Sequence, residues 1–409
     1  MTGPELVALG HAAIAKAHEL ILLGGALGLL SIIAGLISRR VGAPMLLVFL
    51  ALGMLAGEDG VLGIPYDDFT SAYLIGSVAL AVILLEGGLK TPVSMLRLAF
   101  WPATVLATIG VAFTAVILGI FVSLDGVPLL GALLAGSAAA PTDAAAVGVL
   151  LRRAGAALPE RLLALLEVES GLNDPMSVFL TLLLLRLIAE PGTVGIGDAA
   201  LLFLEEMAGG AVLGLAGGWA LAQLLKRLRL EGSLAPVLVL TGGLAVFGLA
   251  QLLGTSGFLA TYLAAIVTGA TRHRARQEVD HFFEGMAWLA QIVLFLMLGL
   301  LVTPHDLVPY LPGAIIGAAV LILLARPVAV FACLIPFGFT MRETAFASWV
   351  GLRGAVPIYL SIIPGLVDPN RDKRLFASIF IVVIASLIVQ GWTVGLSARL
   401  LGFPRRPAS

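Results

Sequence analysis

Long apolar stretches separated by short polar gaps follow one another along the whole chain. A helix that crosses a bilayer needs about 20 mostly apolar residues, and the gaps carry the glycine, proline and charged residues that are typical of connecting loops. The pattern therefore predicts an all-α polytopic membrane protein with about thirteen transmembrane helices. Their expected bounds are 19–38, 43–57, 69–89, 98–123, 127–150, 161–189, 200–225, 234–253, 256–271, 285–303, 309–336, 343–364 and 375–401.

The composition indicates that lipid surrounds most of the chain. Charged residues make up 12% of it and hydrophobic residues 60%, whereas an average soluble protein has about 25% charged residues. So few charges could not coat a soluble particle of this size. The net charge of −1 gives no electrostatic reason to expect a nucleic-acid partner. Because the sequence has no P-loop and no nucleophile elbow, we expect neither an enzyme nor a bound cofactor.

Basic residues are concentrated in every second loop and in the C-terminal tail, and the other loops are acidic or neutral. Lysine and arginine accumulate on the cytoplasmic side of membrane proteins. We therefore predict an N-terminus outside and a C-terminus in the cytoplasm, and only the loop with Arg371, Lys373 and Arg374 departs from this rule. The residues that define the cytoplasmic side are Arg39, Arg40, Lys90, Arg97, Arg152, Arg153, Arg161, Lys226, Arg227, Arg229, Arg272, Arg274, Arg276, Arg342, Arg399, Arg405 and Arg406.

The sixth apolar segment carries the densest cluster of polar side chains. Ionisable groups inside a membrane are costly and indicate function. At the helical period Ser170 and Asp174 share one face, with Glu167 below them, while Glu169 and Asn173 form a neighbouring stripe turned away. One stripe can face an ion path and the other can pack on a partner helix, and oxygen ligands suit an alkali cation. The alternatives are that Asp174 merely bonds a neighbouring helix and that Glu167 is an entrance or structural carboxylate.

The fifth segment contains a helix breaker at membrane depth. Pro141 disfavours helix at Ala140, so the helix is expected to break near Thr142 and Asp143. Broken backbone inside a membrane is tolerated where it is buried or lines a cavity. Its carbonyl groups can bind cations there, and the Asp143 carboxylate can cap the positive helix end. A plain proline kink is the alternative.

The twelfth segment is interrupted in the same way, by Gly351, Gly354 and Pro357. Interrupted helices at corresponding places in two halves indicate an inverted-repeat transporter with its site near the midplane. Arg353, between the two glycines, would be an unpaired buried cation unless a carboxylate met it, and we expect Glu169 to be that partner. Arg326, in the preceding segment, is expected to snorkel or to lie near a helix end.

Glu86 lies close to the end of the third segment, four residues before Lys90. Its depth in the sequence favours a glutamate at the membrane edge over a ligand in the interior.

Five motifs resemble those of the monovalent cation:proton antiporter family that includes the NhaP exchangers and the animal NHE proteins. The branch that the chain resembles most is that of the bacterial cell volume regulation protein A-like potassium/proton antiporters. The resemblance implies an NhaA/NhaP-like fold, in which inverted repeats place two broken helices across each other. The motifs are GMLAGEDG (53–60), LLEGGL (84–89), PTDAAAV (141–147), LEVESGLNDPM (166–176) and GLRGAVP (351–357).

The resemblance also implies roles for particular residues. Asp174 would be the shared proton- and cation-binding carboxylate, with Asn173 as its neighbour. The alkali cation would lie at Asp174, Ser170, Glu86 and the backbone of Thr142, with Asp143 at the crossing of the broken helices. Glu169 and Arg353 would form a structural ion pair. A homodimer is implied as well.

The function that fits these residues is exchange of a monovalent cation, K⁺ or Na⁺, for H⁺ by alternating access. Electrogenic relatives have an aspartate where this chain has Asn173, so we expect electroneutral one-for-one exchange that serves pH and volume homeostasis. The alternatives are a cation channel, which would need an open lined pathway, and a sodium-coupled organic-anion transporter, which would need a further polar pocket.

The organisation expected from the sequence is one transmembrane antiporter domain over residues 1–404 and a short cytoplasmic tail over 405–409. Related full-length proteins often have a cytoplasmic regulatory domain after the last helix, and we expect none in this sequence. The resemblance places the protein in a bacterial inner membrane.

Overall fold

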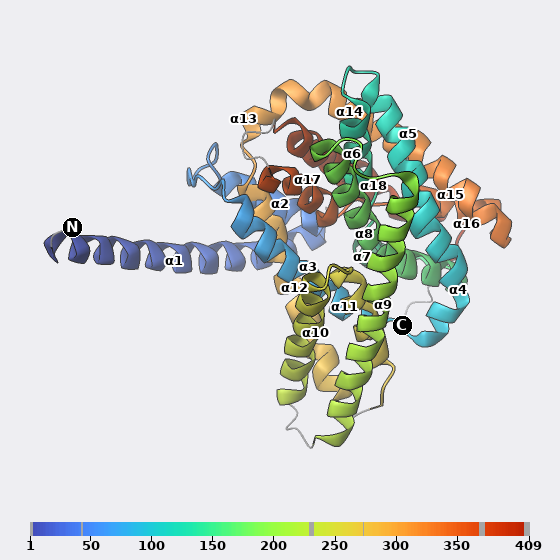
Figure 1. Cartoon of the computed structure of the whole chain (residues 1–409), viewed down its shortest axis with the longest axis horizontal. Helices are drawn as coiled ribbons and strands as arrows, with labels where there is room; N and C mark the ends of the chain where they lie inside the picture. The colour runs from blue at the N-terminus through green and yellow to red at the C-terminus, as the bar shows by residue number, and fades with distance from the viewer. Residues whose placement is uncertain (1–2, 42–43, 229–232, 273, 368–372, 405–409) are drawn as a thin grey trace.

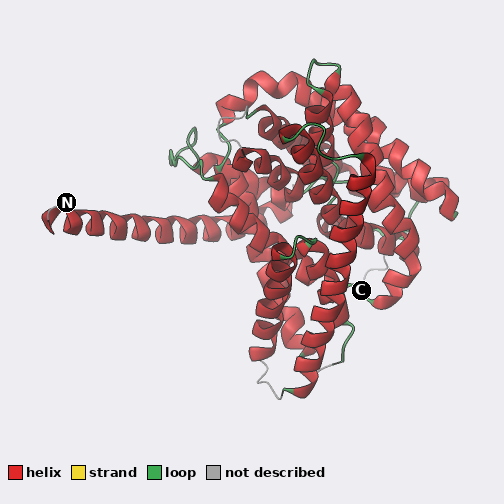
Figure 2. Ribbon diagram, viewed as in Figure 1, coloured by secondary structure: helices red, strands yellow, loops and turns green. Residues whose placement is uncertain are grey.

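The computed structural model describes residues 3–41, 44–228, 233–272, 274–367 and 373–404. Helices make up nearly all of these residues, and the described part contains no named strand, only an isolated bridge between Gly57 and Ile64 (Figure 2). The prediction of an all-α protein is therefore confirmed. The predicted tail 405–409 lies outside the described residues, as do Arg229 and Arg371.

Each predicted apolar segment coincides with one helix or with a pair of consecutive helices. Several stretches that read as one segment are divided: the fourth and eleventh by short π-helical turns, Leu106–Gly110 and Leu321–Ala325, and the fifth and twelfth by breaks. The α-helices are α1 (Gly3–Val41), α2 (Met45–Ala56), α3 (Phe69–Lys90), α4 (Val93–Val105), α5 (Val111–Ser123), α6 (Leu129–Ala139), α7 (Ala144–Ala154), α8 (Glu160–Ala189), α9 (Ile196–Arg227), α10 (Leu234–Leu252), α11 (Gly257–Gly269), α12 (Arg276–Leu300), α13 (Pro304–Leu307), α14 (Leu311–Val320), α15 (Arg326–Leu334), α16 (Met341–Trp349), α17 (Ala355–Val367) and α18 (Arg374–Leu400).

The described helices do not confirm the predicted number of membrane spans. Nine helical stretches of the described chain are long and apolar enough to cross a bilayer, and the pair α6–α7, bent by 42°, makes a tenth. Three further apolar helices, α2, α11 and α17, have 12, 13 and 13 residues. At 1.5 Å per residue such helices reach roughly 18–20 Å, which is less than the hydrocarbon core of about 30 Å. The count of thirteen spans is therefore not confirmed.

The helices pack in two groups. The scaffold group consists of α2, α3 and α9–α12, and the crossing group consists of α4–α8 and α14–α18. The groups meet mainly where α17 packs on α3 and α11 packs on α8. The long helix α1 extends away from the body, and among the described helices it contacts mainly α2 and, less extensively, α12 (Figure 1).

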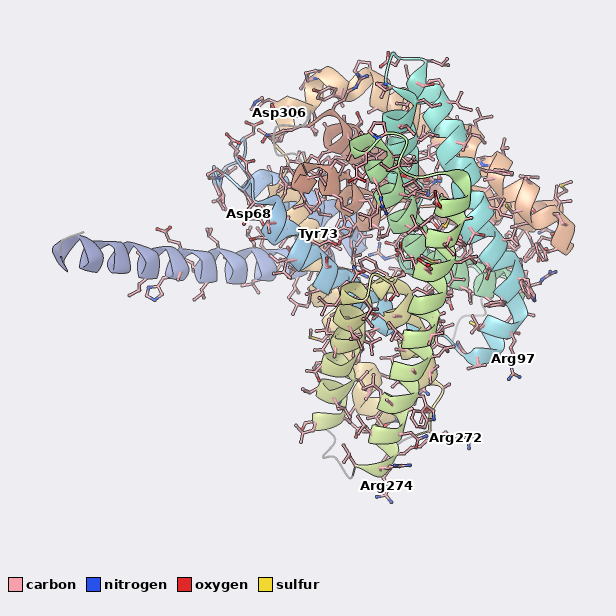
Figure 3. All side chains as sticks on the ribbon, in the orientation of Figure 1. Asp68, Tyr73, Arg97, Arg272, Arg274 and Asp306 are labelled. Atoms are coloured by element: carbon pink, nitrogen blue, oxygen red, sulfur yellow. The ribbon has the colours of Figure 1, made fainter. Side chains whose placement is uncertain are left out.

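Five labelled charged residues lie toward two ends of the molecule according to their sign. Figure 3 shows Arg97, Arg272 and Arg274 toward the lower end of the view, and Asp68 and Asp306 toward the upper left. Asp68 is the N-cap of α3 and accepts hydrogen bonds from the Ser71 hydroxyl and amide and from the Thr70 amide. These bonds lower the pKa of the Asp68 carboxyl. The arrangement agrees with the alternation of charge predicted along the chain.

Candidate functional site

The two broken helices cross and are tied to each other through backbone groups. α6 ends at Ala139, before Pro141, and α7 begins after Asp143, whose carboxylate caps it by accepting from the Ala146 amide at 2.9 Å. The Asp143 amide donates to the carbonyl of Leu352, in the second break, at 2.8 Å. A Cβ atom on Gly354 would lie 2.7 Å from Asp143 Oδ2, so glycine permits this close approach. The predicted breaks are confirmed.

Arg353, in the second break, also binds backbone groups of the first break. Its side chain is 1% exposed, and Nη1 donates to the carbonyl oxygens of Ala140 and Pro141. These carbonyls end α6, where the helix dipole is negative and intrahelical donors are lacking, so a cation is stabilised there. The predicted ion pair between Arg353 and Glu169 is therefore wrong.

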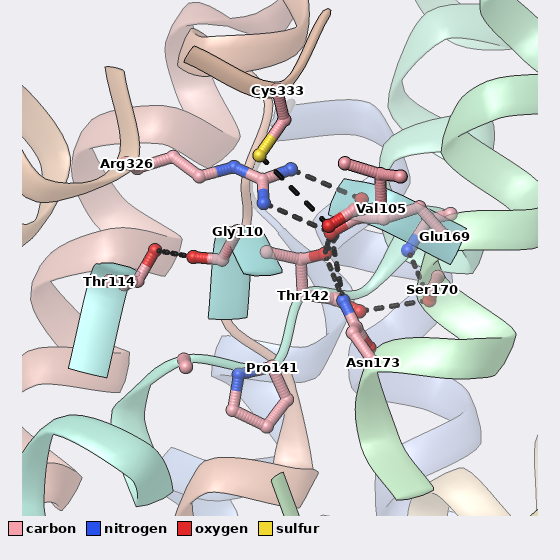
Figure 4. A network of polar contacts seen from close by, with 12 residues as sticks. Val105, Gly110, Thr114, Pro141, Thr142, Glu169, Ser170, Asn173, Arg326 and Cys333 are labelled. Carbon is pink, nitrogen blue, oxygen red and sulfur yellow. Dashed lines mark hydrogen bonds and ion pairs between the residues drawn. The ribbon is translucent and has the colours of Figure 1, made fainter. Parts of the chain in front are cut away.

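Arg326 is the ion-pair partner of Glu169. Its two terminal nitrogens donate to the two carboxylate oxygens at 2.9 and 3.1 Å, and the side chains are only 2% and 1% exposed (Figure 4). The Thr142 hydroxyl donates to the same carboxylate, and Asn173 Nδ2 donates to Thr142 Oγ1 at 2.7 Å and to Glu169 Oε1 at 3.0 Å. Arg326 thus neither snorkels nor lies at a membrane edge. Its position inside an apolar segment is the sequence signal that it needs a partner, but this signal does not say which residue that partner is.

A cavity of about 330 Å³ lies on the other side of α8. Asp174, Ser170 and Glu167 line it, whereas Glu169 and Asn173 do not. The two stripes predicted from the helical period are therefore correct. The cavity reaches the surface at Lys90, Arg152 and Arg153, and we call this side of the molecule the basic face.

At the inner part of the cavity the break in the fifth segment meets α8. The Ser170 hydroxyl donates to the Thr142 carbonyl at 2.8 Å and accepts from the Ala144 amide at 3.2 Å. Asp174 Oδ1 is buried and has no hydrogen-bond partner among the described residues. The carboxylates of Asp143 and Glu169 act on Asp174 electrostatically. A carboxylate that has an open oxygen and negative neighbours is suited to a proton or a cation.

Glu86 lines the same cavity nearer its mouth. Its carboxylate forms an ion pair with Lys90, one helical turn later, at 2.5 Å, and its side chain is 18% exposed. The structure therefore brings Asp174, Ser170, Thr142, Asp143 and Glu86 to one cavity and leaves Asn173 in the adjoining network of Glu169.

Comparison with known proteins identifies the family. A family model described as "Sodium/hydrogen exchanger, transmembrane" matches residues 28–399, which is most of the chain. The chain belongs to the sodium/hydrogen exchanger family. The predicted membership in the cation:proton antiporters is thus confirmed, and with it the expectation of a transporter.

Named relatives of this exchanger agree. The chain is 44% identical over 387 residues to the K(+)/H(+) antiporter NhaP2 of Shewanella sp. (strain ANA-3), covering 94% of this chain and 67% of that protein. It is 28% identical over 391 residues to the Na(+)/H(+) antiporter NhaH of Halobacillus dabanensis, covering 90% and 94%. The sodium proton antiporter MjNhaP1 of Methanocaldococcus jannaschii has the same fold, with a TM-score of 0.83, 24% identity and coverage of 95% and 100%.

Three of the exchanger motifs meet at the site: 141–147 supplies the first break, 166–176 supplies both stripes of α8, and 351–357 supplies Arg353. The motif 84–89 adds Glu86 at the cavity mouth. Arg326 belongs to none of these motifs, which is why the motifs alone did not identify the ion-pair partner of Glu169.

Proposed function

We propose that this exchanger moves K⁺ or Na⁺ against H⁺, one for one, with Asp174 binding either ion in turn. The observation that carries the proposal is the buried, unpartnered Oδ1 of Asp174 beside an accessible cavity. Ser170, Glu86 and the backbone at Thr142 would contribute further oxygens, and Asp143 would add negative charge at the crossing. The named relatives, a K(+)/H(+) antiporter and a Na(+)/H(+) antiporter, support a monovalent cation as the transported ion.

The charges in the site support one-for-one exchange. A proton and a monovalent cation each neutralise one carboxylate, so they compete for Asp174 and the loaded site has the same charge in both directions. Asn173 adds no second negative charge, and its amide donates to Glu169 and Thr142. The proposal is therefore of an electroneutral exchanger.

Alternating access is supported by the contrast between the two sides of the cavity. Toward the basic face the cavity is open, and Leu80 of α3 still lines it. One turn earlier along α3, the Ser77 hydroxyl hydrogen-bonds to that of Tyr359 at 2.8 Å, and Tyr73 stacks on Tyr359 with ring centroids 5.4 Å apart. Tyr359 is 1% exposed. These contacts join α3 of the scaffold group to α17 of the crossing group. If the two helices separated there, the cavity would open on the side opposite the basic face.

The decisive experiment is ion exchange by the full chain in proteoliposomes that contain a pH-sensitive dye. We expect K⁺, Na⁺ or Li⁺ to drive proton flux that saturates, that needs a counter-ion on the opposite side, and that does not respond to a clamped membrane potential. Each net charge moved would otherwise couple at about 2.3 kcal/mol per 100 mV. Competition also predicts that the apparent cation affinity falls as pH is lowered.

Other outcomes would exclude the proposal in different ways. Flux without a counter-ion would indicate a channel, and a rate that follows voltage would contradict one-for-one exchange. Stimulation only by an organic anion together with Na⁺ would indicate the carrier alternative. The ranking of the three cations would identify the transported ion.

We also propose that the basic face is cytoplasmic in a bacterial inner membrane. The native Cys333 is buried, so introduced cysteines can report exposure separately. We expect an impermeant maleimide to label Val61→Cys, in the exposed α2–α3 loop, in intact cells and Arg274→Cys only in everted vesicles. The opposite labelling would invert the orientation.

A further inference from the structure

Tyr262 of α11 lines the cavity and has a buried hydroxyl. Its side chain is 2% exposed, yet its hydroxyl has no hydrogen-bond partner among the described residues. Thr91 is a polar neighbour whose hydroxyl donates to the Gly87 carbonyl at 2.8 Å, and no hydrogen bond joins it to the Tyr262 hydroxyl. Burying a hydroxyl without a hydrogen bond costs free energy, and binding of an ion or a water is one explanation for such a group.

The ring of Tyr262 lies directly against α8 at Gly171. A Cβ atom at residue 171 would lie 2.4 Å from Tyr262 Cζ, the atom that bears the hydroxyl. Gly171 is one turn after Glu167 and one turn before Asp174, on the face of α8 that lines the cavity. The hydroxyl therefore lies along α8 between the outer and the inner carboxylate.

Two further oxygen groups accompany this hydroxyl. Pro175 lies within α8 and has no N–H, so the carbonyl of Gly171 lacks its usual helical donor. Glu167 lines the cavity and makes no ion pair or hydrogen bond within the described residues, although Arg152 and Glu86 act on it electrostatically. A hydroxyl has two lone pairs to offer a cation, and hard cations take oxygen ligands.

We propose that Tyr262 is a transient ligand of the cation. Its hydroxyl oxygen replaces a hydration water as the ion passes between Glu167 and Asp174. This inference rests on the proposed exchange at Asp174. Apolar residues such as Leu80 and Phe295 form other parts of the cavity wall and cannot replace that water. Because this path leads to the basic face, Tyr262 acts on cations that enter from that side.

The test is Tyr262→Phe, which removes one oxygen and keeps the ring against Gly171. Exchange is measured in right-side-out and in everted vesicles, with the cation offered on one side at a time. We expect the KM for the cation to rise about 3- to 10-fold from the basic face, as loss of one polar contact implies, and to stay unchanged from the other side. The ratio of KM values for K⁺, Na⁺ and Li⁺ is also expected to shift.

Tyr66→Phe is the matched control. The Tyr66 hydroxyl is also buried without a partner among the described residues, but it belongs to the α2–α3 loop, outside the cavity lining. Its loss should leave KM unchanged from both sides. An unchanged KM for Tyr262→Phe, or an equal rise from both sides, would overturn the role of Tyr262 while wild-type exchange still stood. Absence of exchange by the wild type would instead refute the proposed function.

Discussion

Replacing Asp174 by asparagine is expected to reduce exchange to the background of empty liposomes while the protein stays folded. The amide has nearly the shape of the carboxylate but can hold neither the transported proton nor the charge that attracts a cation. Asp174 Oδ1 has no hydrogen-bond partner among the described residues, so the substitution breaks no contact of that oxygen. The measurement is dye-reported proton flux in proteoliposomes, with size-exclusion chromatography as the check of folding.

Asp67→Asn makes the same chemical change on an exposed residue of the α2–α3 loop, and it should exchange at the wild-type rate. Exchange retained by folded Asp174→Asn would remove Asp174 from the centre of the mechanism.

The second large effect concerns the buried pair of Glu169 and Arg326. Glu169→Gln or Arg326→Met alone leaves one buried charge without its partner, so each is expected to cost about 3–5 kcal/mol of stability. The double variant should cost clearly less than the sum of the two. The measurement is a double-mutant cycle of unfolding in detergent.

Arg353→Met provides the discriminating control. Its guanidinium donates to backbone carbonyls rather than to Glu169, so Glu169→Gln should not rescue it. Rescue of Arg353→Met, together with additive losses for Arg326 and Glu169, would restore the pairing predicted from the sequence.

The sequence predicted the features that depend on one segment at a time. The helical period separated Asp174 and Ser170 from Glu169 and Asn173, because a residue's face on a helix depends only on its position along that helix. Pro141 likewise marked a break by local chemistry alone. These predictions needed no knowledge of which helices are neighbours.

Features that depend on the contact between segments could not be predicted in this way. Arg326 and Arg353 both lie inside apolar segments, and only the packing of the helices brings Arg326 to Glu169. Tyr262 reads as an ordinary aromatic residue of a buried helix until its contact with Gly171 is seen.

A break in a membrane helix commonly acts as a hinge, but the two breaks of this exchanger are linked to each other by hydrogen bonds. The Arg353 side chain donates to the carbonyls of Ala140 and Pro141, and the Asp143 amide donates to the carbonyl of Leu352. Bending at one break would disrupt the hydrogen bonds that join it to the other break. We therefore infer that the four half-helices α6, α7, α16 and α17 move as one rigid unit.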